Sequence, residues 1–238
     1  MTSPFDPDRL TDTAADSVAR DLGQLAQVEA RLVELRGELA SLPESAGEHE
    51  RAGRQLEIAR ALQVLGRGAE AWPIGRMAFA AFAAAEDWED AADACDVLYQ
   101  SDQAASLAAL GHGIWIGVTF PIDPEISVHL LSHVVDDTPD DADGAAVAAA
   151  TAAFLADLRA PEGPDRDRLV FFANQLLGQV ARRHGGVADQ HGFESWVRRL
   201  ELDEPDKFLV RLRNVVDVLV QDDWWIDRDA IQSRLTVD

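Results

Sequence analysis

Apolar residues recur at helical spacing along almost the whole chain, in segments separated by short glycine, proline or acidic breaks. Alanine, leucine, arginine and glutamate dominate these segments, whereas tyrosine and runs of β-branched residues are scarce. Summed helix propensity therefore favours helix nearly everywhere. The pattern predicts an all-α protein in which a long N-terminal heptad helix precedes an array of helix pairs that merges into a C-terminal helical bundle.

The breaks divide the chain into three expected regions. These are a heptad, coiled-coil-like helix over residues 1–43, helix pairs over 44–122 and a helical bundle over 123–238. Beyond the first region, helices are expected at about 51–65, 69–85, 88–99, 103–113, 124–137, 144–159, 165–184, 189–200, 205–221 and 227–235. Residues 113–124 gather β-branched and aromatic side chains, and we interpret them as a helix end followed by a turn, with a short strand as the alternative.

The N-terminal region carries apolar residues at alternating spacings of three and four, which is typical of a coiled-coil seam. The seam consists of Val18, Leu25, Val28, Leu32, Leu35 and Leu39. Two packings fit this seam. The helix packs on its own domain, or it pairs with a second copy in a structural homodimer.

Charge limits the classes of partner. The chain has 43 acidic and 21 basic residues, for a formal net charge of -22. Such a surface repels phosphate backbones and anionic lipid headgroups, so we expect neither a nucleic-acid nor a membrane partner. Arginine outnumbers the single lysine, Lys207, which together with many alanines indicates a bacterial-like, high-GC coding bias. The acidic excess is typical of salt adaptation or of a protein with a basic partner.

The sequence also indicates a cellular compartment. No apolar run approaches the roughly 20 residues of a membrane-spanning helix. The N-terminal residues lack the basic and apolar regions of a secretion signal, so we expect a cytoplasmic protein. The single cysteine, Cys95, excludes an internal disulfide and lies in a helix among alanines, where a buried structural thiol is expected.

Two successive segments align at a period of 33 residues. The aligned positions are Ala59, Leu62, Gly66, Ala71 and Ala78 in one segment and Ala92, Cys95, Tyr99, Ala104 and Gly111 in the next. Over residues 51–117 this pattern resembles tetratricopeptide repeats, whose helix pairs place small residues where two helices approach closely. The resemblance implies a solenoid that binds protein or peptide in a concave groove.

His129 and His133 are four residues apart, so they share one face of a helix with Glu125 and Asp137. Paired imidazoles with nearby carboxylates can bind zinc or iron. The spacing therefore gives a candidate metal site. The alternative is the polar stripe of an amphipathic helix, because no glutamate follows His129 directly as it does in zinc proteases.

Two groups of side chains are candidates for partner binding. Trp224 and Trp225 stand side by side in an acidic frame, and adjacent helical residues point about 100° apart. Either the tryptophans anchor the last helix to the bundle, or one of them is exposed as a binding hot spot. The second group comprises Arg182, Arg183, Arg198 and Arg199. These arginines either pair with local carboxylates or form a basic island.

The sequence shows no glycine-rich phosphate loop, no hydrolase nucleophile elbow and no dinucleotide-binding fingerprint. We therefore expect a protein–protein interaction module, an adaptor or assembly factor, that has no catalytic activity and needs no cofactor. One alternative is a helical metal-binding protein or metalloenzyme that uses His129 and His133. The other is a structural homodimer formed through the N-terminal helix.

Overall fold

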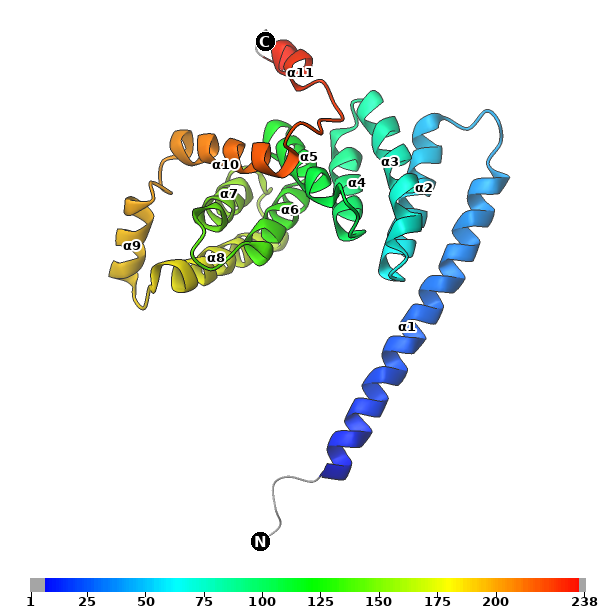
Figure 1. The fold of residues 1–238 in the computed structure, drawn as a ribbon, viewed down its shortest axis with the longest axis horizontal. Coiled ribbons are helices and arrows are strands. Elements are labelled where there is room, and N and C mark those ends of the chain that lie inside the picture. The colour runs from blue at the N-terminus through cyan, green and yellow to red at the C-terminus, as the bar shows by residue number, and fades with distance from the viewer. Residues whose placement is uncertain (1–6, 236–238) are drawn as a thin grey trace.

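The computed structural model describes residues 7–235, with side chains from Leu22 onward. Over this range the chain forms eleven helices and no strand, which confirms the predicted all-α class (Figure 1). The helices are α1 (Pro7–Ser41), α2 (Glu48–Val64), α3 (Gly68–Ala84), α4 (Trp88–Gln100), α5 (Ser106–Thr119), α6 (Pro124–Asp137), α7 (Asp143–Arg159), α8 (Pro164–Gly185), α9 (Gln190–Arg199), α10 (Pro205–Val220) and α11 (Arg228–Leu235).

Local sequence signals determine where these helices begin and end. The Asp87 and Asp123 carboxylates cap α4 and α6 by accepting backbone N–H groups of the first turn. Proline occupies the first turn of α6, α8 and α10, where its missing N–H costs no helical hydrogen bond. Helix α5 continues to Thr119 before a short non-helical connection, so residues 113–124 form the predicted helix end and turn.

Consecutive helices from α2 to α7 pack as pairs, α2 with α3, α4 with α5 and α6 with α7, and α8 packs against α7 (Figure 1). The first helices of successive pairs also touch, α2 with α4 and α4 with α6. Small residues permit this close packing. A Cβ on Gly75 would lie 3.0 Å from Leu98 Cδ2, and a Cβ on Gly113 would lie 2.9 Å from Cys95 Cβ.

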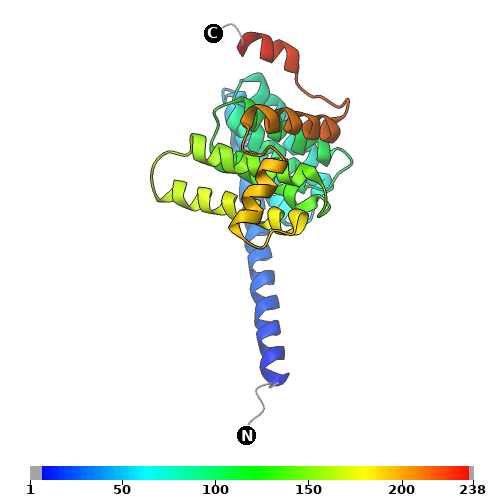
Figure 2. The same cartoon turned by 90° about the vertical axis from the view of Figure 1, so that its left-hand side faces the viewer.

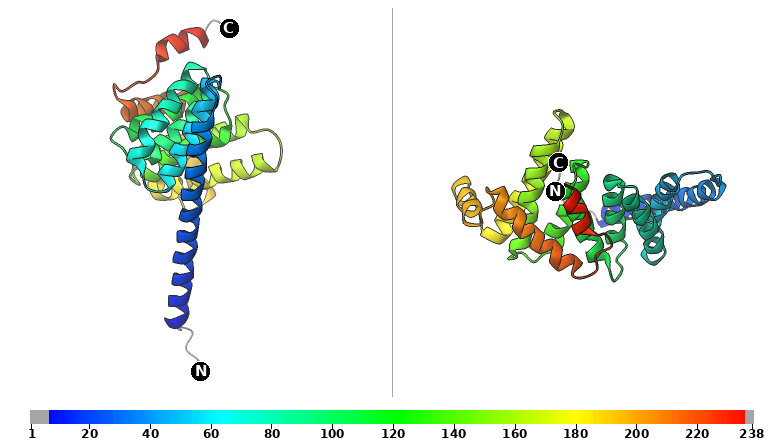
Figure 3. Two further views of the ribbon diagram at one scale, coloured as in Figure 1. Left: turned by 90° about the vertical axis from the view of Figure 1, so that its right-hand side faces the viewer. Right: turned by 90° about the horizontal axis from the view of Figure 1, so that it is seen from above.

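The C-terminal segment, residues 205–235, runs back across the second helices of the pairs. Helix α10 packs on both α7 and α5. At this crossing a Cβ on Gly111 would lie 2.4 Å from Val220 Cγ2, so the glycine allows the two helices to approach. The chain then continues through residues 221–227 to α11, which lies above the array (Figure 3).

Helix α1 packs on α2 through the C-terminal part of the predicted seam. Leu32 and Leu35 are buried, and Val28 and Leu39 are partly buried against the core. Leu25 is 41% exposed, because this part of α1 extends away from the array (Figure 2). The side chain of Val18 lies outside the described residues. Packing on its own domain therefore accounts for the seam from Val28 to Leu39.

The buried side chains form one cluster that reaches from Leu32 in α1 to Ile231 in α11. Helix α5 packs against α6 across the expected boundary at residue 122, and the three-region division stays a prediction. None of the described helices combines the length and apolar character that a membrane crossing requires.

Candidate functional site

The outward sides of α2, α4 and α6 form one surface, which we call the first-helix face. Its residues are Glu50, Glu57, Arg60, Glu89, Asp90, Asp93, Asp96, Glu125, His129, His133 and Asp136. Apart from the adjacent pair Glu89 and Asp90, they recur at intervals of three, four or seven residues along each helix, as the outward stripe of a helix does. Acidic side chains predominate in this set, and most of them are at least partly exposed.

Polar contacts cross the face from each first helix to the next. Arg60 Nη2 on α2 lies 2.5 Å from Asp93 Oδ2 on α4. The backbone N–H of Asp123, at the start of α6, donates to Glu89 Oε2 on α4 over 2.9 Å. These partners are 33 and 34 residues apart in sequence, so the contacts join corresponding positions of successive helix pairs.

The centre of the face holds a cluster of two histidines and one carboxylate. Asp96 Oδ1 on α4 lies 2.7 Å from His133 Nε2 and 3.6 Å from His129 Nε2, both on α6. The second carboxylate oxygen, Oδ2, accepts a hydrogen bond of 2.6 Å from Gln100 Nε2. Each of Asp96, His129 and His133 offers one ligand atom, and these atoms lie within 4.8 Å of one another.

The other two carboxylates of the predicted metal site have different neighbours. Asp137 accepts a hydrogen bond from the Tyr99 hydroxyl. Burial and this bond raise the pKa of Tyr99, so the phenol remains a donor. Glu125 lies with His129 at a surface hollow between α6 and α8. The structure therefore brings the two histidines together with Asp96 rather than with Glu125 or Asp137.

Sequence reasoning missed Asp96 because it lies on another helix, 37 residues before His133. One signal was present. Asp96 falls in a stretch of α4 that is otherwise apolar, between Cys95 and Val97, and its side chain is only 8% exposed. A carboxylate buried in such a setting needs a partner.

Trp224 and Trp225 lie in the turn between α10 and α11, and both are half-buried. Both rings pack on His112 of α5, with centroid separations of 4.8 Å for Trp224 and 4.3 Å for Trp225. The guanidinium of Arg76 lies 3.4 Å from the Trp225 ring centroid, and that of Arg228 lies 3.8 Å from the Trp224 ring. The two tryptophans thus anchor the C-terminal segment to the array.

His112 is fully buried under these rings. Burial disfavours its charged form and lowers its pKa to about 4. Burial also lowers the pKa of Arg76, whose guanidinium packs on the Trp225 ring. The imidazole is therefore neutral at physiological pH and serves as a structural group in this packing.

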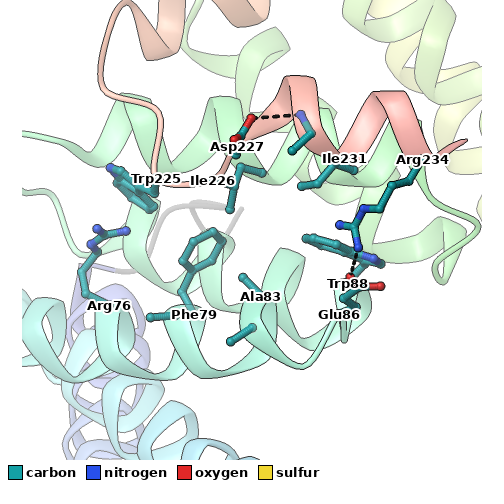
Figure 4. Close-up of a pocket in the computed structure, with 13 residues that line it drawn as sticks. Arg76, Phe79, Ala83, Glu86, Trp88, Trp225, Ile226, Asp227, Ile231 and Arg234 are labelled. Atoms are coloured by element: carbon teal, nitrogen blue, oxygen red, sulfur yellow. Dashed lines mark hydrogen bonds and ion pairs between the residues drawn. The ribbon is translucent and has the colours of Figure 1, made fainter.

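A groove of about 340 Å³ lies between α3 and α11 (Figure 4). Phe79 and Ala83 of α3 face Ile226 and Ile231 across it. An ion pair of 2.5 Å between Arg234 Nη1 and Glu86 Oε1 joins its two sides. Because α11 itself forms one wall, the groove belongs to the anchoring of the C-terminal segment.

The four predicted partner-binding arginines lie in the last turns of α8 and α9. Arg183 donates to the carbonyl oxygen of Val135, and Arg198 Nε donates to that of Glu194 over 3.1 Å. Arg182 and Arg199 are exposed, and within residues 22–235 neither side chain makes a hydrogen bond or an ion pair. Hydrogen bonds to backbone carbonyl groups therefore hold Arg183 and Arg198, two of the four predicted arginines.

Cys95 is fully buried, and burial raises the pKa of its thiol well above the usual value, which confirms the expected structural thiol.

Comparisons with protein-family models, curated proteins and solved structures gave no match to this chain. What the protein does is therefore inferred from its own residues.

Proposed function

We propose that the chain is a protein-binding module of tetratricopeptide-like design, an adaptor or assembly factor whose first-helix face recognises a basic segment of another protein. This proposal rests on a difference between the two sides of the array, because the C-terminal segment covers only one of them. The C-terminal segment packs across α5 and α7, whereas α4 and α6 pack, in the described part of the chain, mainly on neighbouring helices of the array. The first-helix face is thus the side left for a partner.

The charge of this face indicates the partner's chemistry. Glu50, Glu125 and Asp136 are exposed, and no ion pair within residues 22–235 involves any of them. The whole chain carries a formal net charge of -22. Acidic side chains without internal partners attract arginine and lysine, and complementary charge accelerates encounter and selects partners.

An apolar hollow adjoins the acidic residues and indicates that the partner also carries an apolar side chain. It lies between α6 and α8, has a volume of about 500 Å³ and is lined by Val128, Leu169 and Phe172, with Glu125 and Asp165 among its polar residues. The Phe172 side chain is 47% exposed there. A bulky apolar side chain in such a pocket is a typical binding hot spot. The partner segment should therefore combine basic residues with an apolar anchor.

A charge-reversal experiment tests the proposal. The probe is a fluorescently labelled short peptide of interspersed arginine and leucine. The triple variant Glu50→Arg, Glu125→Arg, Asp136→Arg is compared with the matched variant Glu44→Arg, Asp203→Arg, Asp222→Arg, which reverses the same number of exposed acids in loops outside the face. We expect the face variant to weaken peptide binding at least about tenfold and the matched variant to change it about twofold or less.

Two results would overturn the proposal. If both triple variants weaken peptide binding equally, the peptide responds only to the net charge of the chain and not to the first-helix face. Unchanged binding by the face variant would place the peptide elsewhere on the molecule. Circular dichroism of both variants establishes that the helical array is intact, because all six positions are exposed.

A further inference from the structure

We propose that Asp96, His129 and His133 bind a divalent first-row transition metal ion, and that Zn²⁺ fits this ligand set. The site goes beyond peptide recognition, because it would join α4 to α6 whether or not a partner is bound. It also differs from the ligand set that helical spacing alone indicates, since its carboxylate comes from the preceding helix pair.

The separations of the two histidine nitrogens from Asp96 Oδ1 can be compared with those of a tetrahedral zinc site, and all three ligand atoms lie within 4.8 Å of one another. Nitrogen and carboxylate ligands lie about 2.0–2.2 Å from Zn²⁺, so tetrahedral neighbours are roughly 3.3–3.6 Å apart. Asp96 Oδ1 and His129 Nε2 already have this separation, at 3.6 Å. Asp96 Oδ1 and His133 Nε2, at 2.7 Å, would move apart by less than about 1 Å as the ion replaces their hydrogen bond.

The chemistry of the ligands selects the class of ion. Two imidazole nitrogens and one carboxylate oxygen form the protein ligand set of catalytic zinc sites and of non-haem iron(II) sites. Calcium and magnesium prefer sites made entirely of oxygen. The His129 side chain is 55% exposed, so the fourth coordination position opens towards solvent on a face whose acidic residues attract cations.

Neighbouring groups hold two of the ligands in place. Gln100 Nε2 donates to Asp96 Oδ2, which leaves Oδ1 directed at the histidines. The Tyr99 ring packs on the His133 ring, with centroids 4.6 Å apart. Outer contacts of this kind fix the orientation of metal ligands. Asp96 and His133 are thus positioned by the fold, and His129 is the ligand free to adjust.

A second group on the same face, His49 with Asp87 and Asp90, supplies an internal comparison. Its ligand atoms also lie within 4.8 Å of one another, but it offers a single imidazole. Asp87 already caps α4 by accepting the Asp90 backbone N–H over 3.2 Å. One nitrogen and two partly exposed carboxylates form a poorer set for a transition metal, so His49 variants serve as controls.

Calorimetric titration of the full chain with zinc chloride tests the site. We expect one tight equivalent of Zn²⁺ in the unmodified protein. His129→Gln and His133→Gln should each weaken this binding at least about tenfold, whereas His49→Gln should change it about twofold or less. Thermal melting gives a second readout, because an ion that binds only the folded array raises its Tm. Zinc should raise the Tm of the unmodified chain and of His49→Gln but not that of His129→Gln.

Two outcomes would overturn the site. In one, His129→Gln and His133→Gln bind zinc as tightly as the unmodified chain. In the other, His49→Gln loses as much zinc affinity as His129→Gln and His133→Gln do, which would mean that zinc binds the acidic surface without a specific site. The His129→Gln variant tests the site even if variants of the buried Asp96 or of His133 fail to fold. The His129 side chain is 55% exposed, and its Nε2 lies 3.6 Å from Asp96 Oδ1, beyond hydrogen-bond distance.

Discussion

The backbone N–H of Trp225 donates a hydrogen bond to His112 Nε2 over 2.8 Å, joining residues 113 positions apart. A backbone N–H can only donate, so Nε2 must be the unprotonated nitrogen. Nδ1 lies 2.7 Å from the Ala108 carbonyl oxygen and therefore carries the proton. Only the neutral imidazole satisfies both contacts, which makes the attachment of the C-terminal segment sensitive to acid.

The first prediction concerns pH. The pKa of His112 is lowered to about 4 in the folded chain, whereas an unfolded histidine titrates near 6.5. Between these values the unfolded state binds a proton that the folded state does not, so stability falls as pH decreases from about 6.5 to about 4, by up to about 3 kcal/mol. Urea unfolding across this range measures the loss. His112→Leu should be less stable at neutral pH, because the Trp225 N–H loses its acceptor, and should have a shallower pH dependence. The same acid slope in both proteins would contradict this role of His112.

The second prediction concerns Trp225. Its ring packs on His112, on Phe79 at 5.3 Å between centroids and on the Arg76 guanidinium, so Trp225→Ala removes one of the two rings that anchor the turn before α11. We expect a loss of about 2–4 kcal/mol and faster tryptic cleavage within residues 228–235. Phe171→Ala is the control, because Phe171 is 65% exposed and its loss should cost about 0.5 kcal/mol or less. Unchanged cleavage of the Trp225 variant would mean that α11 is held by other contacts.

The third prediction compares two glycines in helix interiors. Gly111 faces Val220 of α10, and a Cβ there would lie 2.4 Å from a Val220 methyl group. Gly111→Ala should therefore push α10 from α5 and cost about 1–3 kcal/mol, despite the better helix propensity of alanine. At Gly53 nothing lies within 4 Å of the added atom, so Gly53→Ala should stabilise by about 0.5–1 kcal/mol. Chemical unfolding measures both, and effects of the same sign would refute the proposed tight crossing.

The fourth prediction separates the two ends of the heptad seam. Leu35 is 1% exposed where α1 packs on α2, so Leu35→Ala should cost about 2–4 kcal/mol. Leu25 is 41% exposed beyond the array, so Leu25→Ala should cost about 1 kcal/mol or less. Unfolding experiments at several protein concentrations check this. A large, concentration-dependent loss in Leu25→Ala would instead identify the outer seam as a dimer interface.

Helix boundaries were predictable from the sequence where local capping chemistry sets them. The prediction was wrong for α5, which runs over Ser106–Thr119 rather than 103–113, because the buried residues Ile114, Trp115 and Ile116 continue the helix. Asp87 and Asp123 cap helices that begin within one residue of their predicted starts, and proline marks the first turn of α10. The tryptophan pair shows the limit of such reasoning. The angle of about 100° between neighbours applies within a helix. Trp224 and Trp225 lie in a turn, where both can reach His112.

The candidate site was predictable only in part. Helical spacing correctly placed His129 and His133 on one side of α6. It could not supply Asp96, because contact between α4 and α6 depends on how two helix pairs stack. The packing of α10 across α5 and α7 is likewise non-local. The 33-residue repeat makes Gly111 a small residue at a contact within a helix pair, whereas it in fact faces Val220 of α10.

The location of a bound basic peptide is the measurement that bears most directly on the proposed function. A short arginine- and leucine-containing peptide with a photoreactive group would be crosslinked to the full chain, and the modified residues identified by mass spectrometry. We predict crosslinks on α2, α4 and α6 and at the hollow beside Phe172, with few on α10 and α11. Crosslinks concentrated on the C-terminal segment, or spread evenly over the acidic surface, would contradict recognition by the first-helix face.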